Sequence, residues 1–258
     1  MSVDLNKIRR YERKYLVTQA QADRIRRFLK PYFKLDAFTD EALGGYTINN
    51  VYLDTLDLSF YRDTKERRLR RFKPRMRYYG AAPDAGLWLE VKNKLGDIVW
   101  KHRRRVDASE WPGVLDARPE TRTDVVARFG PQTFEDVVGL YPVVPMLHVR
   151  YFREAWVSEI DSYGRVTFDT RLRCRAANLS PQLGPLEHDL DFYDDAITTT
   201  AADSMVLLEV KTETLVPWWA LAIARNAELW QRGFSKYCYG IEHVHEVPWS
   251  FGRTVRLG

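Results

Sequence analysis

The most basic stretch of the chain, residues 67–79, carries residue types that bind anions. Read as a β-strand, in which alternate side chains point to opposite faces, it separates bases from apolar residues. One face would carry Arg71, Lys73, Arg75, Arg77 and Tyr79, and the other Phe72, Pro74, Met76 and Tyr78. The planar guanidinium of arginine binds phosphate oxygens through paired hydrogen bonds, so this face could hold phosphate groups. A solvated basic strand is the alternative, and this segment alone does not decide between the two.

The same separation of charged and apolar faces recurs along the chain. The predicted strands that show it cover residues 11–17, 87–94, 98–106, 147–155, 164–173 and 205–213. Their charged faces hold mostly lysine and arginine, whereas faces that simply met water would mix acids and bases. The acids on these faces are few: Glu12, Glu90, Asp169, Glu209 and Glu213. A sheet that rolls into a barrel could gather the charged faces into a lumen, with helices covering the apolar faces.

So many like charges in a lumen have a chemical consequence. Burying them is costly unless a polyanion or trapped ions compensate the charge. The few carboxylates would suit a divalent metal, which typically binds one or two carboxylates together with phosphate oxygens. Phosphoryl transfer depends mainly on positioning and on neutralising charge, and this residue set favours that chemistry. The sequence contains neither a P-loop nor a dinucleotide-binding glycine motif.

Helices and turns must connect and cover these strands. Thr18 is a predicted N-cap for a helix that ends near Pro31, and Gly96-Asp97 suits a hairpin turn. The remaining predictions are a strand over 46–54, a helical turn over 57–62, two short helices over 121–140 split at Gly130-Pro131, a long connection over 176–204 and an amphipathic helix over 217–232. The predicted fold class is α+β, an antiparallel barrel that forms a tunnel, with helices packed outside.

The composition describes a chain that can bury a core. Of 258 residues, 45% are hydrophobic, and 40 Lys and Arg against 35 Asp and Glu give a net charge of +5. The two cysteines, Cys174 and Cys238, provide no disulfide framework. No apolar run is long enough to span a membrane, and residues 1–10 lack the apolar core of a signal peptide. We therefore expect a cytoplasmic protein without a membrane span.

Several short motifs occur in an order that matches a known family. They are Glu12-Arg13-Lys14-Tyr15, Val51-Tyr52-Leu53-Asp54-Thr55, Arg75-Met76-Arg77-Tyr78-Tyr79-Gly80, Leu89-Glu90-Val91-Lys92-Asn93-Lys94, Tyr151-Phe152-Arg153, Arg165-Val166-Thr167-Phe168-Asp169, Leu208-Glu209-Val210-Lys211 and Ser235-Lys236-Tyr237. With this ordered set the chain resembles the catalytic VTC domain of inorganic polyphosphate polymerases, in the triphosphate tunnel metalloenzyme (CYTH-like) superfamily. The resemblance covers nearly the whole chain, so we expect a single domain over residues 1–258 with its core over residues 8–242.

The resemblance implies an antiparallel tunnel barrel that binds ATP, inorganic polyphosphate, triphosphate or pyrophosphate with a divalent metal, Mn2+ or Mg2+. It further implies that the γ-phosphate of ATP is added to a growing polyphosphate chain inside the tunnel. By the same resemblance, the residues that hold phosphates during catalysis would be Lys14, Arg75, Arg77, Lys92, Arg153, Arg165 and Lys236. Lys94 would also bind substrate, Tyr151 would donate a hydrogen bond near the phosphates, and Glu209 would be a metal ligand.

Some candidates have a second interpretation. Glu90 is either a second metal ligand or a group that orients Lys92 and Arg103. Lys101 and Arg103 are predicted to bind substrate from a wall of the tunnel. Lys211 is a candidate for substrate binding, although it could instead form a salt bridge with Glu209. Lys236 could be no more than a cation near a helix end.

The opening motif bears on the type of reaction. The hydrolase branch of the superfamily usually begins with Glu-x-Glu-x-Lys, whereas this chain has Glu12-Arg13-Lys14 at that place. Because losing an acid weakens metal activation of a hydrolytic water, the motif favours a polymerase. The alternatives are a triphosphatase that hydrolyses inorganic triphosphate or nucleotides, and a non-catalytic sensor of polyphosphate or nucleotides. Nucleic acid is not an expected partner, and an unidentified membrane partner that receives the polymer is left open.

Overall fold

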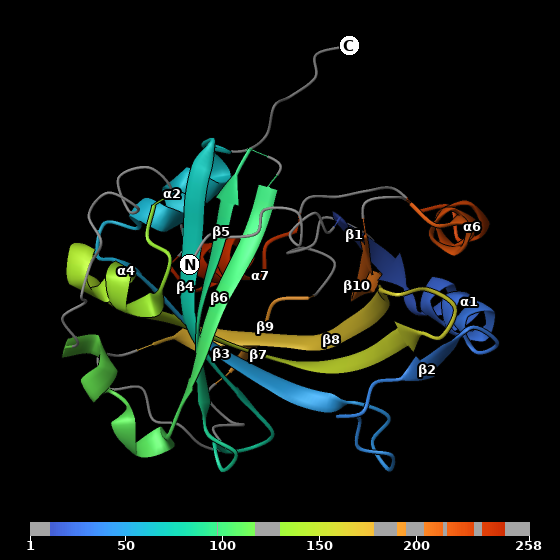
Figure 1. Ribbon diagram of the computed structural model, residues 1–258, viewed down its shortest axis with the longest axis horizontal. Helices are drawn as coiled ribbons and strands as arrows, with labels where there is room; N and C mark the ends of the chain where they lie inside the picture. Colours follow the sequence, from blue (N-terminus) through green and yellow to red (C-terminus); the bar gives the residue numbers. More distant parts are fainter. Residues whose placement is uncertain are drawn as a thin grey trace. The chain divides into compact units, whose positions relative to one another are not determined.

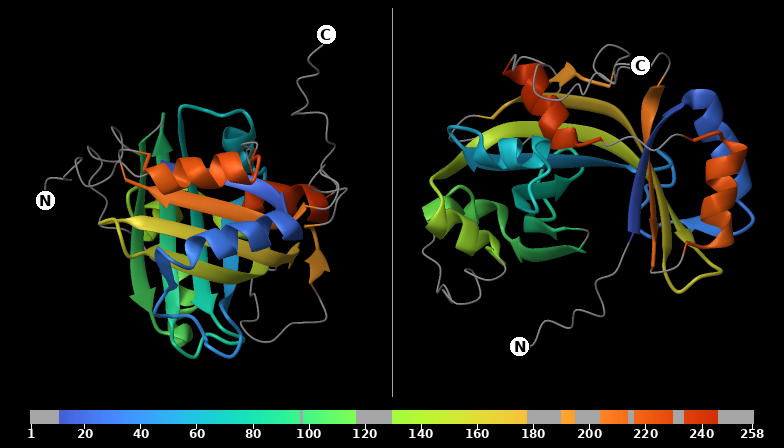
Figure 2. Two further views of the ribbon diagram at one scale, coloured as in Figure 1. Left: turned by 90° about the vertical axis from the view of Figure 1, so that its right-hand side faces the viewer. Right: turned by 90° about the horizontal axis from the view of Figure 1, so that it is seen from above.

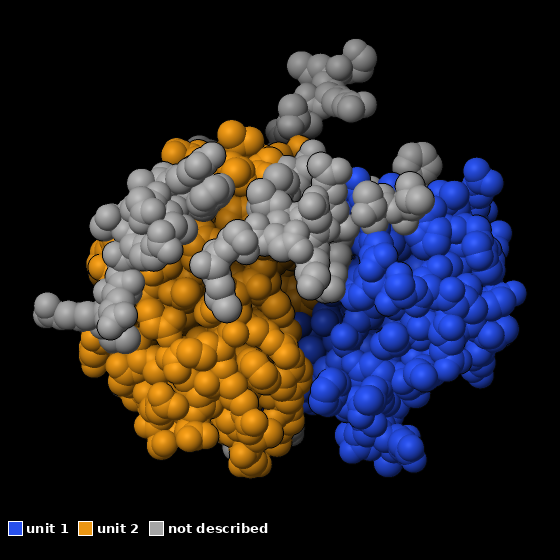
Figure 3. All heavy atoms as spheres, in the orientation of Figure 1, with its two compact units in different colours: residues 1–48, 150–173, 191–235 blue, residues 49–149, 174–190, 236–258 orange. Residues whose placement is uncertain are grey.

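A computed structural model describes residues 11–96, 98–116, 130–177, 190–194, 204–213, 216–229 and 234–245. The chain divides into two compact units, each assembled from segments that are distant in sequence (Figure 3). Unit 1 comprises residues 1–48, 150–173 and 191–235, and unit 2 comprises residues 49–149, 174–190 and 236–258. The single domain expected over residues 1–258 stays a prediction.

The strands belong to a ten-stranded sheet (Figure 1). Its main order is β1 (Tyr11–Thr18), β10 (Ser204–Thr212), β8 (Gly164–Ala176), β7 (Val143–Ser158), β3 (Tyr46–Thr55), β4 (Arg70–Tyr79), β5 (Leu87–Leu95) and β6 (Ile98–Val106). Two short strands lie off this path, since β2 (Phe33–Leu35) pairs with β7 and β9 (Asp191–Phe192) pairs with β8. The pairs β1–β10, β10–β8, β4–β5 and β5–β6 are all antiparallel.

In unit 1, two helices cover the apolar face of the strands. Helix α1 (Gln19–Leu29) begins after Thr18, whose hydroxyl accepts from the backbone N–H of Gln21 in a capping box. Helix α6 (Trp218–Asn226) lies beside α1 (Figure 2). The core between the helices and the strands contains Ala22, Ile25, Leu29, Trp219 and Ile223 from the helices and Tyr15, Val17, Val166, Phe168, Val206, Leu208 and Val210 from the strands.

In unit 2, helices α2 (Ser59–Lys65) and α4 (Phe134–Leu140) supply apolar side chains to a second core. From the strands this core receives Val51, Leu53, Phe72, Met76, Tyr78, Leu87, Leu89, Val91 and Val106. Short 3-10 helices follow β6 at Ala108–Glu110 and Gly113–Asp116. Helix α7 (Lys236–Val244) completes the unit.

The predicted fold class, α+β with an antiparallel sheet and helices packed outside, is confirmed, and the closure of this sheet into a tunnel stays a prediction. Most element predictions agree with the structure, because alternation identifies the strands and caps identify the helix ends. The short helix predicted over 57–62 is α2, and the helix predicted from 217 ends earlier, at Asn226. Of the two short helices predicted over 121–140, the second is α4, and the first lies outside the described residues, as does most of the predicted 176–204 connection. No helix among the described residues has the length and hydropathy needed to cross a bilayer.

Candidate functional site

In unit 2, strand register brings the basic residues of three strands into rows. Pairing of β4 with β5 and of β5 with β6 aligns Arg77 with Trp88 and Arg105, Arg75 with Glu90 and Arg103, Lys73 with Lys92 and Lys101, and Arg71 with Lys94 and Val99. Directly paired residues in a sheet project to the same side, with Cβ atoms about 5 Å apart. We call this set the basic face of unit 2. It lies opposite the core side chains Met76, Leu89 and Val91, because side chains alternate along each strand.

One buried carboxylate organises the middle of the basic face. Glu90 is only 1% exposed. Its Oε2 accepts from Arg75 Nε at 2.8 Å and lies 3.8 Å from Arg77 Nε, and its Oε1 accepts from Lys101 Nζ at 3.0 Å. Burial favours the neutral acid, but Arg75, Arg77 and Lys101 outweigh it and hold the pKa of Glu90 well below its usual range. We call these four residues the Glu90 cluster.

Lys101 is the member of the Glu90 cluster with the weakest hold on its proton. Partial burial lowers the pKa of Lys101 to about 8, since the opposing attraction of Glu90 is offset by the charges of Arg75 and Arg77. Its side chain remains 38% exposed. The ammonium group therefore loses its charge close to physiological pH.

Groups on β3 hold the two arginines in place. Asn50 Oδ1 accepts from Arg77 Nε at 2.8 Å, and the hydroxyl of Tyr52 accepts from Arg75 Nη1 at 3.2 Å. The ring of Tyr52 also packs against Tyr237, with centroids 5.0 Å apart. These contacts fix the arginine side chains in defined directions and reduce the entropy lost when an anion binds.

Helix α7 starts with Lys236, which is buried, and is anchored by polar contacts to β3 and α2. The hydroxyl of Tyr237 donates to Asp54, a fully buried carboxylate that also accepts backbone N–H groups of Phe60 and Tyr61. Burial raises the pKa of Asp54 above its usual value despite these hydrogen bonds. The contact between Tyr237 and Asp54 positions the first turn of α7 and with it Lys236.

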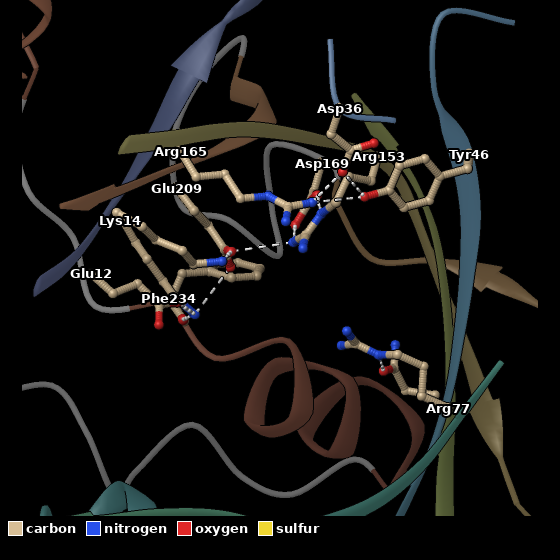
Figure 4. Close-up of polar contacts among 12 residues, drawn as sticks. Glu12, Lys14, Asp36, Tyr46, Arg77, Arg153, Arg165, Asp169, Glu209 and Phe234 are labelled. Atoms are coloured by element: carbon tan, nitrogen blue, oxygen red, sulfur yellow. Dashed lines mark hydrogen bonds and ion pairs between the residues drawn. The ribbon is translucent and has the colours of Figure 1, made fainter. Parts of the chain in front are cut away.

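In unit 1, a second buried carboxylate collects cations from three strands (Figure 4). Glu209 on β10 is 4% exposed. Its Oε2 accepts from Lys211 Nζ at 2.9 Å and from Arg153 Nη2 at 3.2 Å. Its Oε1 lies 3.4 Å from Lys14 Nζ, which also lies 3.5 Å from Glu12. We call Lys14, Arg153, Glu209 and Lys211 the Glu209 cluster.

Arg153 is held more firmly than any other base of the Glu209 cluster by a two-point contact. Its Nε and Nη2 donate to the two oxygens of Asp169 at 2.6 and 2.7 Å, and its guanidinium lies 5.4 Å from the ring centre of Tyr151. Burial disfavours the charged form, but Asp169, Tyr151 and Glu209 outweigh it and keep the pKa of Arg153 above its usual value. Such a bidentate pair leaves little freedom of orientation.

Arg165 forms a neighbouring network with two residues that the sequence did not single out (Figure 4). Its Nη2 donates to Asp36 and, at 3.0 Å, to the hydroxyl of Tyr46, which in turn donates to Asp36 at 3.0 Å. Burial raises the pKa of Tyr46, although the charges of Arg153 and Arg165 act against it. No spacing or motif connects Asp36 with Arg165 in the sequence, so only the fold could identify this contact.

Comparison with known protein families decides the classification. The model of the VTC domain matches residues 9–245. This chain belongs to the VTC domain family. No curated protein sequence matches it at a significant level.

Several solved structures are similar to this VTC domain at low sequence identity. A Bacillus halodurans protein provisionally named an adenylate cyclase has a TM-score of 0.46 and 12% identity, with 87% of this chain and 92% of that chain covered. The PH1819 protein of Pyrococcus horikoshii OT3 has a TM-score of 0.43 and 10% identity, with coverage of 91% and 99%. The Mimivirus capping enzyme triphosphatase has a TM-score of 0.36 and 8% identity, with coverage of 87% and 91%.

The structure assigns the predicted site residues of this VTC domain to two groups, one in each unit. Unit 1 holds Lys14, Tyr151, Arg153, Arg165, Glu209 and Lys211. Unit 2 holds Arg75, Arg77, Glu90, Lys92, Lys94, Lys101, Arg103 and Lys236. The positioning residues Asp36, Tyr46, Asn50, Tyr52 and Tyr237 were not predicted. Tyr52 and Tyr237 lie within the family motifs, which gave them no role of their own, and a single Asn, Asp or Tyr elsewhere is compatible with many environments.

The carboxylates bear on how a divalent metal could be held. Among the described residues, no group of three or more His, Cys, Asp or Glu side chains is arranged to bind a metal. Glu209 meets basic nitrogen atoms at both oxygens, and so does Glu90. Mg2+ and similar ions commonly use one or two carboxylates and take their other ligands from phosphates and water. The donor set of the described residues therefore fits a metal that arrives with phosphate and shares one or two carboxylates with it.

Proposed function

We propose that this VTC domain is a metal-dependent polyphosphate polymerase, which transfers the γ-phosphoryl group of ATP to the end of an inorganic polyphosphate chain. The observation that carries the proposal is the basic face of unit 2. Its rows contain Lys and Arg at every position except Trp88, Glu90 and Val99. A face with this many bases attracts a multivalent anion, and a chain of phosphates carries the charge to match it.

The reaction would use these groups for positioning and charge neutralisation. The bond between the γ-phosphorus and its bridging oxygen breaks, a terminal oxygen of the acceptor chain forms the new bond, and ADP leaves. Arg75, Arg77, Lys92 and Lys101 would bind phosphate oxygens from unit 2, with Lys94, Arg103 and Lys236 as further contacts. Arginine suits the transferred group, because its fork can bind two oxygens as charge moves between them.

From unit 1, Lys14, Arg153, Arg165 and Lys211 would bind further phosphates, and Tyr151 would support Arg153 through its ring. Glu209 would hold a divalent metal, Mn2+ or Mg2+, jointly with phosphate oxygens. When bound, the metal supplies additional positive charge to the phosphates. Glu90 is buried beneath Arg75 and Lys101, and we assign it to orienting these bases.

The pairing of two carboxylates with bases favours transfer to phosphate over hydrolysis. A hydrolase needs a group that takes a proton from water or a metal that activates it. Glu12 and Glu209 are both paired with Lys14, and Glu209 has two further cationic partners. Neither carboxylate is placed to accept a proton from water.

Both cysteines are free thiols, which agrees with the reducing cytoplasm that we propose as the location.

Product analysis tests the proposal directly. The purified chain, incubated with ATP and Mn2+, is expected to produce ADP and long phosphate chains in matched amounts, resolved by gel electrophoresis and 31P NMR. Release of free phosphate as the only phosphate product would identify a triphosphatase and overturn the proposal. Tight binding of ATP or polyphosphate without turnover at any metal concentration would identify a sensor and would overturn it as well.

A further inference from the structure

One aromatic ring interrupts the basic face of unit 2. Trp88 lies on β5 two residues before Glu90, so both side chains project from the same side of the strand. In the register of the sheet, Trp88 lies directly between Arg77 and Arg105. The guanidinium carbon of Arg103 lies over its indole ring, 4.0 Å from the ring centre. Trp88 is therefore an apolar ring surrounded by arginines.

The core of unit 2 does not explain this ring. The apolar side chains that β5 contributes to the core are Leu87, Leu89 and Val91, which project from the opposite side of the strand. Trp88 is only half-buried. On the charged side of the sheet this half-buried ring does not fill the core, and it already carries the stacked guanidinium of Arg103, so the position suits stacking with a planar group.

We propose that Trp88 and Arg103 form the subsite for the purine base of ATP. This inference rests on the proposed function and extends it to the part of the substrate that carries no phosphate. Nucleobases stack on aromatic rings and on guanidinium planes, and the two are already stacked here. Two residues along a strand span about 7 Å, so the base would stack roughly one ribose away from phosphates bound at the Glu90 cluster.

The subsite would let the site distinguish its nucleotide donor from its polyphosphate acceptor. ATP has a base to stack, whereas inorganic polyphosphate and tripolyphosphate have none. Stacking would add affinity for the nucleotide donor without changing the affinity for the polymer. After transfer, ADP keeps its base on the subsite while the lengthened chain is held only through its phosphates.

Binding measurements on the full chain test this subsite. Dissociation constants for ATP and for inorganic tripolyphosphate are measured by calorimetry for the wild type, Trp88→Ala and Trp88→Phe. A base stacked on one aromatic ring contributes enough that Trp88→Ala should weaken ATP binding about tenfold or more. Tripolyphosphate binding should stay within about twofold of the wild type. Trp88→Phe, which keeps a smaller ring, should recover much of the affinity for ATP.

A second tryptophan, Trp218, provides the control. Trp218→Ala removes a 53% exposed tryptophan in unit 1 and should leave both affinities unchanged. An equal loss for ATP and tripolyphosphate in Trp88→Ala, or no loss for either, would overturn the subsite and leave the proposed phosphate site intact. If the wild type bound neither compound, both proposals would fail. Similar thermal unfolding temperatures for Trp88→Ala and Trp88→Phe would show that both variants are folded when their affinities are compared.

Discussion

The two units differ in how many acids accompany the bases of their candidate site residues. In unit 1 the bases are matched by acids: Lys14, Arg153, Arg165 and Lys211 contact Glu12, Asp36, Asp169 and Glu209. In unit 2 the rows of the basic face contain a single acid, Glu90, among many bases. The site bases of unit 1 therefore each lie against an acid, whereas the basic face of unit 2 carries many more bases than acids.

This difference affects two properties separately: how firmly the basic side chains are oriented and how strongly they attract an anion. A base that already has an ion pair is fixed in direction, and keeping it buried costs less than burying the same base without a partner. A face with many more bases than acids attracts an anion more strongly, but its bases repel one another until the anion arrives. We infer that the basic face of unit 2 attracts phosphate more strongly than the Glu209 cluster of unit 1, whose bases are fixed mainly in direction.

The largest expected effect concerns stability in unit 1. Arg153→Met leaves the buried Asp169 without its two-point partner, which should lower the free energy of unfolding by about 3–5 kcal/mol. Arg75→Met in unit 2 should cost only about 1 kcal/mol, because Glu90 keeps Arg77 and Lys101. Urea denaturation of both variants measures the two values. Equal losses would remove the distinction between the units, and the double variant Arg153→Met/Asp169→Leu should restore part of the stability.

The next effect concerns activity. Arg75→Ala should lower turnover by about 100- to 1000-fold, as the loss of one preorganised donor to a transition state does elsewhere. Lys14→Ala should also abolish most turnover while the chain stays folded. Arg104→Ala is the matched control, because Arg104 lies on β6 but pairs with Glu135 away from the basic face. Steady-state kinetics that showed the same loss for Arg104→Ala would argue against a role specific to the basic face.

Metal dependence should distinguish the two buried carboxylates. Glu209→Gln should raise the Mn2+ concentration for half-maximal activity about tenfold or more, a change typical of groups that support a metal. Glu90→Gln should lower activity without that change, because Glu90 orients bases. In calorimetry, Mn2+ alone should bind weakly to the wild type and more tightly once tripolyphosphate is present. Strong binding of Mn2+ without phosphate would contradict a metal site that phosphate oxygens complete.

The smallest effect is a pH dependence confined to unit 2. With a pKa of about 8, Lys101 loses its proton as the pH rises through 8, and the basic face then loses a positive charge. The value of kcat/KM for ATP, which reports on the free enzyme, should therefore fall a few-fold above pH 8. Lys101→Arg should keep its charge and flatten this limb of the profile. A wild-type profile that stayed level to about pH 10 would contradict the assignment.

Much of the fold followed from local patterns. The hairpin strand 98–106 was predicted with the bounds it has in the structure, because a glycine turn precedes it and the alternation of charged and apolar residues runs along it. Thr18 identified the start of α1 for the same local reason. Long-range contacts had no such signal. Asp36 and Arg165 are 129 positions apart, and nothing in either neighbourhood indicates the other.

The sequence by itself determined which face of each strand would be charged, since alternation is a property of neighbouring residues along one chain. It also determined the family, through motifs that occur in a fixed order. The sequence offered the pair of Lys211 and Glu209, which the structure contains, but only the tertiary structure decided the acid–base contacts between distant segments. Strand register places Glu90 between Arg75 and Arg103, yet the side chains bring it to Arg75 and Lys101. Such partners depend on the packing of several strands at once, and a linear pattern does not encode them.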